Sequence, residues 1–141
     1  MNTTRHDEMR EAAIRFHREH PEVWQLFVRF TFELIHRGFQ HYSARAIFHR
    51  IRWETAEAGV DQEKEFKIGN NHSPFYARRF MAMYPQYAPV FDEDGKKVEH
   101  GFFRTREQIS KREVRWDLPE LGPQDFPYTY EPEPQDQQSL F

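Results

Sequence analysis

The sequence predicts a mainly α-helical domain with a small β hairpin, followed by a tail that does not fold. Four segments have apolar residues at helical spacing and capping residues at their ends, which predicts four helices. An Asp-Gly pair between short apolar runs predicts a hairpin. From residue 117 the chain is rich in proline and acid and cannot bury enough apolar surface to fold. The predicted division is a domain at 1–116, a disordered linker at 117–136 and a terminal peptide at 137–141.

The first two helices are predicted over residues 4–19 and 21–38. Thr4 can cap the first helix, Pro21 suits the first turn of the second, and Gly38 can end it. Apolar residues of the second helix cover more than one face. A helix of that kind is buried on most sides, so we expect it to lie at the centre of the domain.

The third helix is predicted from its cap, Ser43, to about Ala58. Its side chains separate into two stripes. The apolar stripe consists of Ala44, Ile47, Phe48, Ile51 and Thr55. The basic stripe, roughly a quarter to a third of a turn away, consists of Arg45, His49 and Arg52.

The fourth helix is predicted from Ser73, as its cap, and Pro74 to near Pro85. The residues expected to face the core are Tyr76, Phe80, Met83 and Tyr84. The residues expected to point away from the core are Phe75, Arg78 and Arg79.

A hairpin is predicted with its tip at Asp94-Gly95, between 90–91 and 96–98. Residues 102–106 could be a returning strand, while Thr105 and Gln108 also form a capping box that would start a helix over 106–115. Both alternatives stay open at this point. A short strand is also predicted at 66–68.

Composition narrows the class of protein. The chain has no cysteine, which excludes disulfides and thiol chemistry. It has no secretion signal and no apolar run long enough to cross a bilayer, so we expect a cytoplasmic protein without a membrane partner. Residues 1–89 carry 13 basic and 11 acidic side chains, whereas residues 90–141 carry 7 and 12. Fifteen of the twenty basic residues are arginine, which makes forked contacts with phosphate.

Candidate nucleic-acid-binding residues fall in three segments. They are the basic stripe of the third helix, the start of the fourth helix, where free amides favour phosphate, and the segment after the hairpin. The candidates are Arg45, His49, Arg52, Asn70, Asn71, His72, Arg78, Arg79, Arg104 and Arg106. The alternative is that these arginines are ordinary surface charges paired with Glu33, Glu54, Glu57 and Glu65.

The order of these elements is similar to that of a winged helix-turn-helix domain. That resemblance implies binding to double-stranded DNA, with the third helix of the trio in the major groove and the hairpin on the backbone. The connector at 59–72 is longer than the tight turn of that family. Residues 41–84 also resemble a small family of uncharacterised bacterial and phage proteins, to which we attach no activity.

The last five residues, Gln-Gln-Ser-Leu-Phe, resemble the peptide with which bacterial replication and repair proteins dock on the β sliding clamp. The resemblance implies that Leu140 and Phe141 enter an apolar cleft and that Gln137 bonds a polar subpocket. Ser139 is then a small spacer. The sequence therefore predicts a DNA-associated accessory protein, near the nucleoid, tethered to the clamp in replication or repair.

Two other classes of function stay open. One is a phage-type inhibitor that competes for the clamp or for another host protein. The other is a magnesium-dependent nuclease, because Glu65 and Lys67 match half of a restriction-type site that Glu54 or Asp61 would complete. The sequence contains no nucleophile elbow or phosphate-binding glycine loop. The leading expectation is therefore a protein without enzymatic activity, cofactor or metal site, with the nuclease kept as an alternative.

Overall fold

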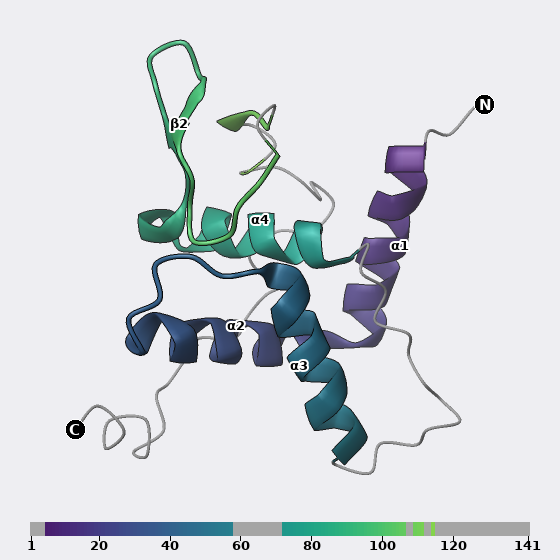
Figure 1. The fold of residues 1–141 in the computed structure, drawn as a ribbon. Coiled ribbons are helices and arrows are strands. Elements are labelled where there is room, and N and C mark those ends of the chain that lie inside the picture. The colour runs from purple at the N-terminus through teal and green to yellow at the C-terminus, as the bar shows by residue number, and fades with distance from the viewer. Residues whose placement is uncertain (1–4, 58–71, 107–108, 112–113, 115–141) are drawn as a thin grey trace.

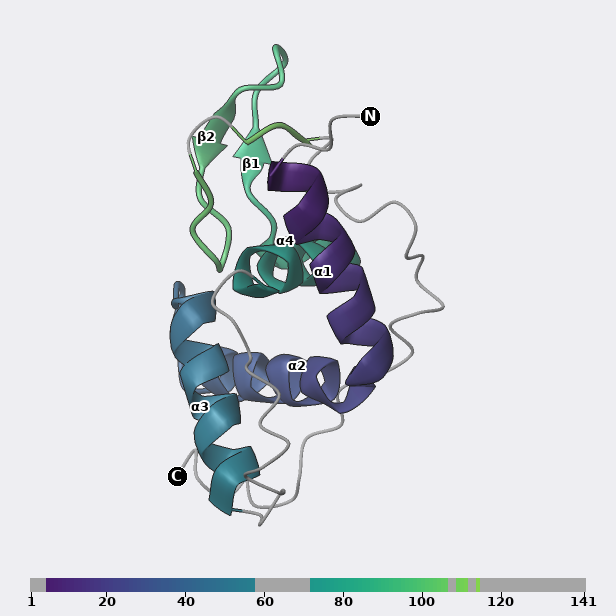
Figure 2. The same ribbon diagram turned by 90° about the vertical axis from the view of Figure 1, so that its right-hand side faces the viewer.

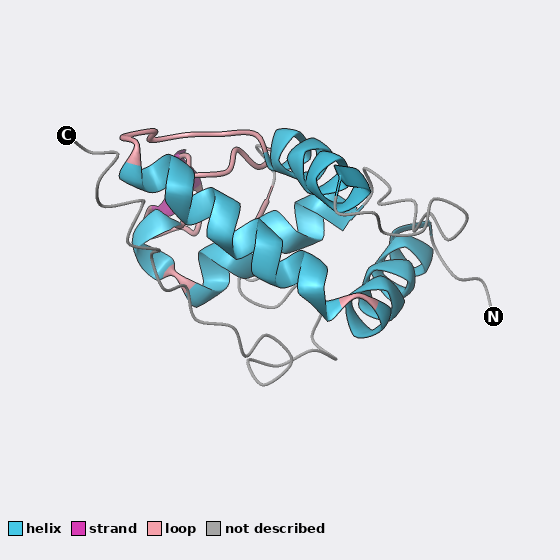
Figure 3. Ribbon diagram, turned by 90° about the horizontal axis from the view of Figure 1, so that it is seen from below, coloured by secondary structure: helices cyan, strands magenta, loops and turns pink. Residues whose placement is uncertain are grey.

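The computed structural model describes residues 5–57, 72–106, 109–111 and 114. Helices make up most of this part (Figure 3). A two-stranded antiparallel hairpin follows the last long helix (Figure 1). The elements in chain order are α1 (Arg5–Glu19), α2 (Pro21–His36), α3 (Ala44–Glu57), α4 (Ser73–Met83), the 3₁₀ turn η3 (Pro85–Tyr87), β1 (Val90–Phe91) and β2 (Lys97–Glu99).

Helix α2 is the central element, as its apolar coverage predicts. It packs against α1, α3 and α4. Its buried residues occupy more than one face and include Val23, Trp24, Phe27, Val28, Phe30, Thr31 and Leu34. Figure 1 shows α3 beginning between α2 and α4 and running down in front of one end of α2, with α1 standing upright beside the ends of α2 and α4. The core therefore lies where these helices meet.

Helix α2 ends as Gly38 predicts. Gly38 has a positive φ of 94°, which glycine adopts without the steric cost that a Cβ would impose. The Phe39 amide donates to the Leu34 carbonyl at 3.1 Å, and the Gly38 amide donates to the Ile35 carbonyl at 3.0 Å. This Schellman pair satisfies carbonyls that the end of the helix would otherwise leave without donors.

The two predicted stripes of α3 are confirmed. Ile47, Phe48 and Ile51 are almost completely buried, while Arg45 and the rest of the basic stripe are exposed. Ser43 acts as the cap, since its Oγ accepts a bond from the Ala46 amide at 3.2 Å. The expected end of the helix near Ala58 lies outside the described residues.

Helix α4 is more buried than the sequence predicts. Phe75, Arg78 and Arg79 do not point away from the core: their exposed fractions are 2%, 7% and 6%. The expectation fails because α4 is surrounded, and burial runs without a break from Phe75 to Met81. Ser73 is also the first helical residue and not the cap, which is His72.

The hairpin extends from the end of α4 so that its tip lies beyond the helices (Figure 2). Val90 pairs with Glu99 and Phe91 with Lys97, so the register changes by one residue between the two pairs. Asp92 orders the tip, because its carboxylate accepts the amides of Asp94 at 3.0 Å and Lys96 at 2.8 Å. The predicted hairpin is therefore confirmed, whereas the predicted strand at 66–68 lies outside the described residues.

The chain returns from the hairpin to the helices through residues 101–103. Phe103 forms an isolated parallel bridge with Tyr42 instead of a third hairpin strand, and the Tyr42 amide donates to the Phe102 carbonyl at 3.0 Å. Phe102 and Phe103 are 3% and 1% exposed. This pairing places the residues that follow beside the start of α3. Of the alternative helix at 106–115, only parts are described.

Gly101 lies where the returning chain passes closest to its neighbours. A Cβ at this position would lie 2.5 Å from the Tyr87 carbonyl oxygen and 2.7 Å from Met81 Sδ. The Gly101 carbonyl also accepts a bond from His41 Nδ1 at 3.0 Å. Glycine is therefore required here by close approach of the backbone.

Gly101→Ala should destabilise the domain by about 1–3 kcal/mol, the usual cost of forcing extra volume into a packed site. The free energy of unfolding in urea measures this directly. Gln25→Ala, at an exposed position of α2, is the control and should change it little. Equal midpoints for Gly101→Ala and the parent would contradict the assigned contact.

The mainly helical fold class with a small hairpin is thus confirmed, while the winged-helix likeness stays a prediction. Residues 115–141, including the expected linker and terminal peptide, lie outside the described residues. None of the described helices combines the length and apolar character needed to cross a bilayer.

Candidate nucleic-acid interface

A pocket of about 540 Å³ opens where the starts of α3 and α4 meet the segment that follows the hairpin. Four of the predicted residues line it. They come from regions far apart in the sequence and are Arg45, Arg78, Arg104 and Arg106. The fold therefore gathers into one place arginines that the sequence could only assign to separate segments.

The first wall is the entry to α3. Tyr42, Ser43, Ala44 and Arg45 line the pocket there. These residues include the first turn of the helix, where backbone amides have no partner within the helix and carry partial positive charge. This wall favours an anion through backbone and side chain together.

The second wall is the start of α4, with Ser73, Pro74 and Arg78. Ser73 and Arg78 are only 6% and 7% exposed, so this wall forms the inner side of the pocket. The Arg78 guanidinium lies 5.0 Å from the centre of the Phe75 ring, a cation–π contact that helps to hold it in place. A second helix N-terminus therefore faces the same cavity.

The third wall consists of Arg104, Thr105 and Arg106. Lys97 on β2 holds its backbone: Nζ donates to the Thr105 carbonyl at 2.9 Å, to Thr105 Oγ1 at 3.2 Å and to the Arg106 carbonyl at 3.0 Å. Through these charge-assisted bonds, the hairpin holds the backbone of the third wall in place.

The lining is electrostatically one-sided. Four arginines line the pocket, and none of the described lining residues is acidic. The alternative, that the candidate arginines pair with glutamates, does not hold for two of the acids named. Glu33 pairs with Arg50 at 2.9 Å and with Arg29 at 3.5 Å, and Glu54 lies 4.0 Å from Arg50. The other two acids, Glu57 and Glu65, have side chains outside the description.

The remaining candidates are placed differently. His49 and Arg52 are exposed on α3 beyond the pocket, and Arg79 is buried without lining it. His72 lies at the start of α4 but faces α1. Asn70 and Asn71 lie outside the described residues, as do the terminal-peptide residues Gln137, Ser139, Leu140 and Phe141, and Asp61, Glu65 and Lys67 of the alternative nuclease site.

His72 is held against an aromatic ring. It stacks on Phe16, with ring centres 4.4 Å apart and planes inclined by 13°. Burial lowers the pKa of His72 below its ordinary value of 6.5, because the charged form loses hydration. The imidazole is therefore neutral near neutral pH and is a weaker phosphate ligand than the sequence suggests.

Sequence reasoning missed three contributors to the pocket. Tyr42 and Thr105 line it, and Lys97 supports it. Thr105 had a signal in the sequence, since it lies between two candidate arginines. Tyr42 and Lys97 had none, because their roles depend on which segments the fold brings together. Ser43 and Ser73 were predicted only as caps, although residues at helix N-termini lie where anions are favoured.

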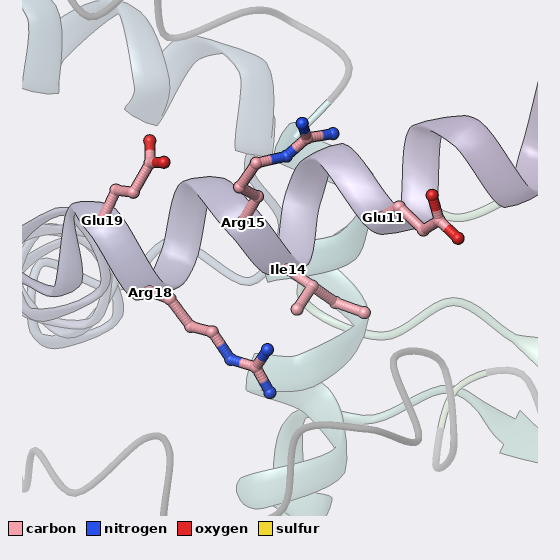
Figure 4. A pocket seen from close by; sticks show the side chains of 5 residues that line it. All are labelled: Glu11, Ile14, Arg15, Arg18 and Glu19. Carbon is pink, nitrogen blue, oxygen red and sulfur yellow. The ribbon is translucent and has the colours of Figure 1, made fainter.

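Two other polar groups on the described surface and in the core lack the one-sided charge of this pocket. A surface depression along α1 has Arg15 and Arg18 but also Glu11 and Glu19 (Figure 4), so its charges balance. His17, which the sequence places near His20, is buried with Nδ1 3.2 Å from the Tyr76 hydroxyl. The described residues contain no group of three or more side chains arranged to hold a metal ion.

Comparison of the chain with protein-family models, with curated proteins and with solved structures finds no match.

His72→Phe should make the free energy of unfolding depend less steeply on pH in the acidic range. In the unfolded chain this histidine takes up a proton near pH 6.5, whereas the folded protein resists protonation until a lower pH. Between these two pKa values the unfolded state binds more protons, so the parent loses stability as pH falls. Phenylalanine keeps the ring on Phe16 and does not titrate.

Urea unfolding at a series of pH values between about 7 and 5 measures the effect. His36→Phe, at an exposed position of α2, should keep the steeper slope of the parent because His72 is still present. Identical slopes for His72→Phe and the parent would show that His72 is not the group that responds.

Proposed function

We propose that the protein is a DNA-associated accessory factor of bacterial or phage origin. The arginine pocket, defined by Arg45, Arg78, Arg104 and Arg106, binds nucleic-acid phosphate. Residues 137–141 tether the protein to the β sliding clamp. It works near the nucleoid, in the cytoplasm, and modulates replication or repair without an enzymatic step of its own.

The observation that carries the proposal is the convergence of the four arginines on one pocket. Guanidinium groups match the geometry of phosphate oxygens, and nucleic acids are the commonest large partners that present phosphates in quantity. Two helix N-termini add amide donors at the same place. The exposed His49 and Arg52 extend this surface along α3.

The mode of contact differs from that of the winged-helix resemblance. A recognition helix needs an exposed face to enter the major groove, and α4 is buried from Phe75 to Met81. The proposed contact is therefore made by the beginnings of two helices and by the segment after the hairpin. Such a surface favours phosphate contacts, which position a protein without reading the sequence of bases.

The tether rests on the residues of the terminal peptide alone. Burial of a leucine and a phenylalanine side chain contributes roughly 1.5–3 kcal/mol each, and ordering a short peptide offsets part of this. An affinity on the order of micromolar follows. A clamp on DNA would then concentrate the arginine pocket beside the duplex.

Arg45→Gln combined with Arg104→Gln should lower the affinity for a short duplex by at least roughly tenfold, because each charge-assisted contact contributes roughly 1.5–3 kcal/mol. Losing two phosphate contacts should also reduce the slope of log affinity against log salt by about 1.8. Fluorescence anisotropy over a range of salt concentrations measures both quantities.

The matched control is Arg15→Gln with Arg18→Gln, since both arginines are exposed on α1 and the change in net charge is the same. This control should keep nearly all of the affinity. If the two double variants lose affinity equally, net charge and not the pocket governs binding. If the parent binds no DNA, the proposed function is wrong.

Leu140→Ala with Phe141→Ala should abolish binding to purified β clamp, measured by calorimetry with the full-length protein, and should leave the unfolding curve unchanged. Leu121→Ala with Phe126→Ala removes the same side-chain types from the preceding segment and should leave clamp binding intact. Retention of clamp binding by the first variant would remove the evidence for the tether.

A further inference from the structure

The arginine pocket has a depth that a passing nucleic-acid backbone does not require. Arg45, Arg104 and Arg106 are exposed at its rim, whereas Arg78 and Ser73 at the inner side are 7% and 6% exposed. A phosphate within a strand has the chain continuing on both sides, so it meets the rim more readily than the inner wall. A phosphate at the end of a strand can enter the pocket and reach both the rim and the inner wall.

The charge of the pocket is also greater than one backbone phosphate needs. A phosphodiester carries one negative charge, while a phosphomonoester carries about −1.5 to −2 at neutral pH and offers three oxygen acceptors. Four arginines line the pocket, and their positive charge attracts a multiply charged anion more strongly than a singly charged one.

The surface beside the pocket can accept the rest of a strand. From Arg45, α3 carries His49, Arg52 and Trp53 on its exposed side over roughly 12 Å, at 1.5 Å per residue. Trp53 is 66% exposed. Exposed aromatic rings beside basic side chains are typical of surfaces on which unpaired bases stack.

From these observations we propose that the arginine pocket binds the terminal phosphomonoester of a nucleic-acid strand, with the adjoining unpaired nucleotides lying along α3. This inference rests on the proposed function and specifies its ligand as a phosphorylated strand end. Arg78 contacts the phosphate at the inner side of the pocket, and Arg45 and Arg104 contact it at the rim.

Binding of the full-length protein to otherwise identical single-stranded oligonucleotides tests this proposal. One carries a 5′ phosphate, one a 3′ phosphate and one only hydroxyl ends, each labelled at an internal base. We expect one phosphorylated end to raise affinity by at least roughly tenfold, and inorganic phosphate to compete for that advantage. Arg45→Gln with Arg104→Gln should remove the advantage, and Arg15→Gln with Arg18→Gln should keep it.

Three results would overturn the inference, and each has a different consequence for the proposed function. Equal affinity for all three oligonucleotides, with binding still sensitive to the rim variant, assigns the pocket to internal phosphates and leaves the proposed function intact. Binding of inorganic phosphate without binding of any oligonucleotide, single-stranded or duplex, assigns the pocket to a small anion and removes both proposals. If both double variants lose the preference for a phosphorylated end, that preference comes from net charge and not from the pocket. The rim variants avoid the buried Arg78, whose replacement would endanger folding.

Discussion

The ring of Phe27 lies where the separate parts of this domain meet. It is fully buried, and its neighbours include Phe48 on α3 at 5.6 Å, Tyr76 on α4 at 5.7 Å and Phe103 after the hairpin at 5.3 Å. In the sequence, each partner lies within three residues of an arginine that lines the arginine pocket. Phe48 follows Arg45, Tyr76 precedes Arg78, and Phe103 precedes Arg104. Aromatic packing around one residue of α2 therefore sets the distances between the three walls, although Phe27 does not line the pocket itself.

Tyr76 extends this packing in a way that an apolar residue could not. Its ring lies within 5.4 to 5.7 Å of Trp24, Phe27 and Phe48, while its hydroxyl lies 3.2 Å from His17 Nδ1 on α1. Burial raises the pKa of that hydroxyl, and the Glu22 carboxylate adds to the effect, so the group stays protonated and can serve as a donor. One side chain thus joins α1 to the core that orders the pocket.

The sequence was sufficient for the helices and the hairpin because the signals for these elements are local. Gly38, Ser43 and Asp94-Gly95 act through their own backbone and immediate neighbours, and the structure places them as predicted. The environment of α4 was not predictable in this way. Its arginines follow the spacing of an exposed stripe, but whether a stripe is exposed depends on what packs against it, and Arg78 and Arg79 are covered. The same limit applies to the pocket: four of the ten nucleic-acid candidates meet there, and no local pattern could select those four.

The hairpin differs in one respect from the wing that the topological likeness implies. In a winged-helix domain the corresponding element touches the DNA backbone, and two lysines on this hairpin would suit that task. Here Lys97 turns toward the domain and donates all three of its assigned bonds to Thr105 and Arg106. A lysine occupied by backbone carbonyls has few donors left for phosphate. Its charge still adds to the field at the arginine pocket, so the hairpin contributes to the pocket from the side of the third wall. The rigidity of the third wall then depends on the same segment, residues 101–103, that Gly101 allows to pass between Tyr87 and Met81.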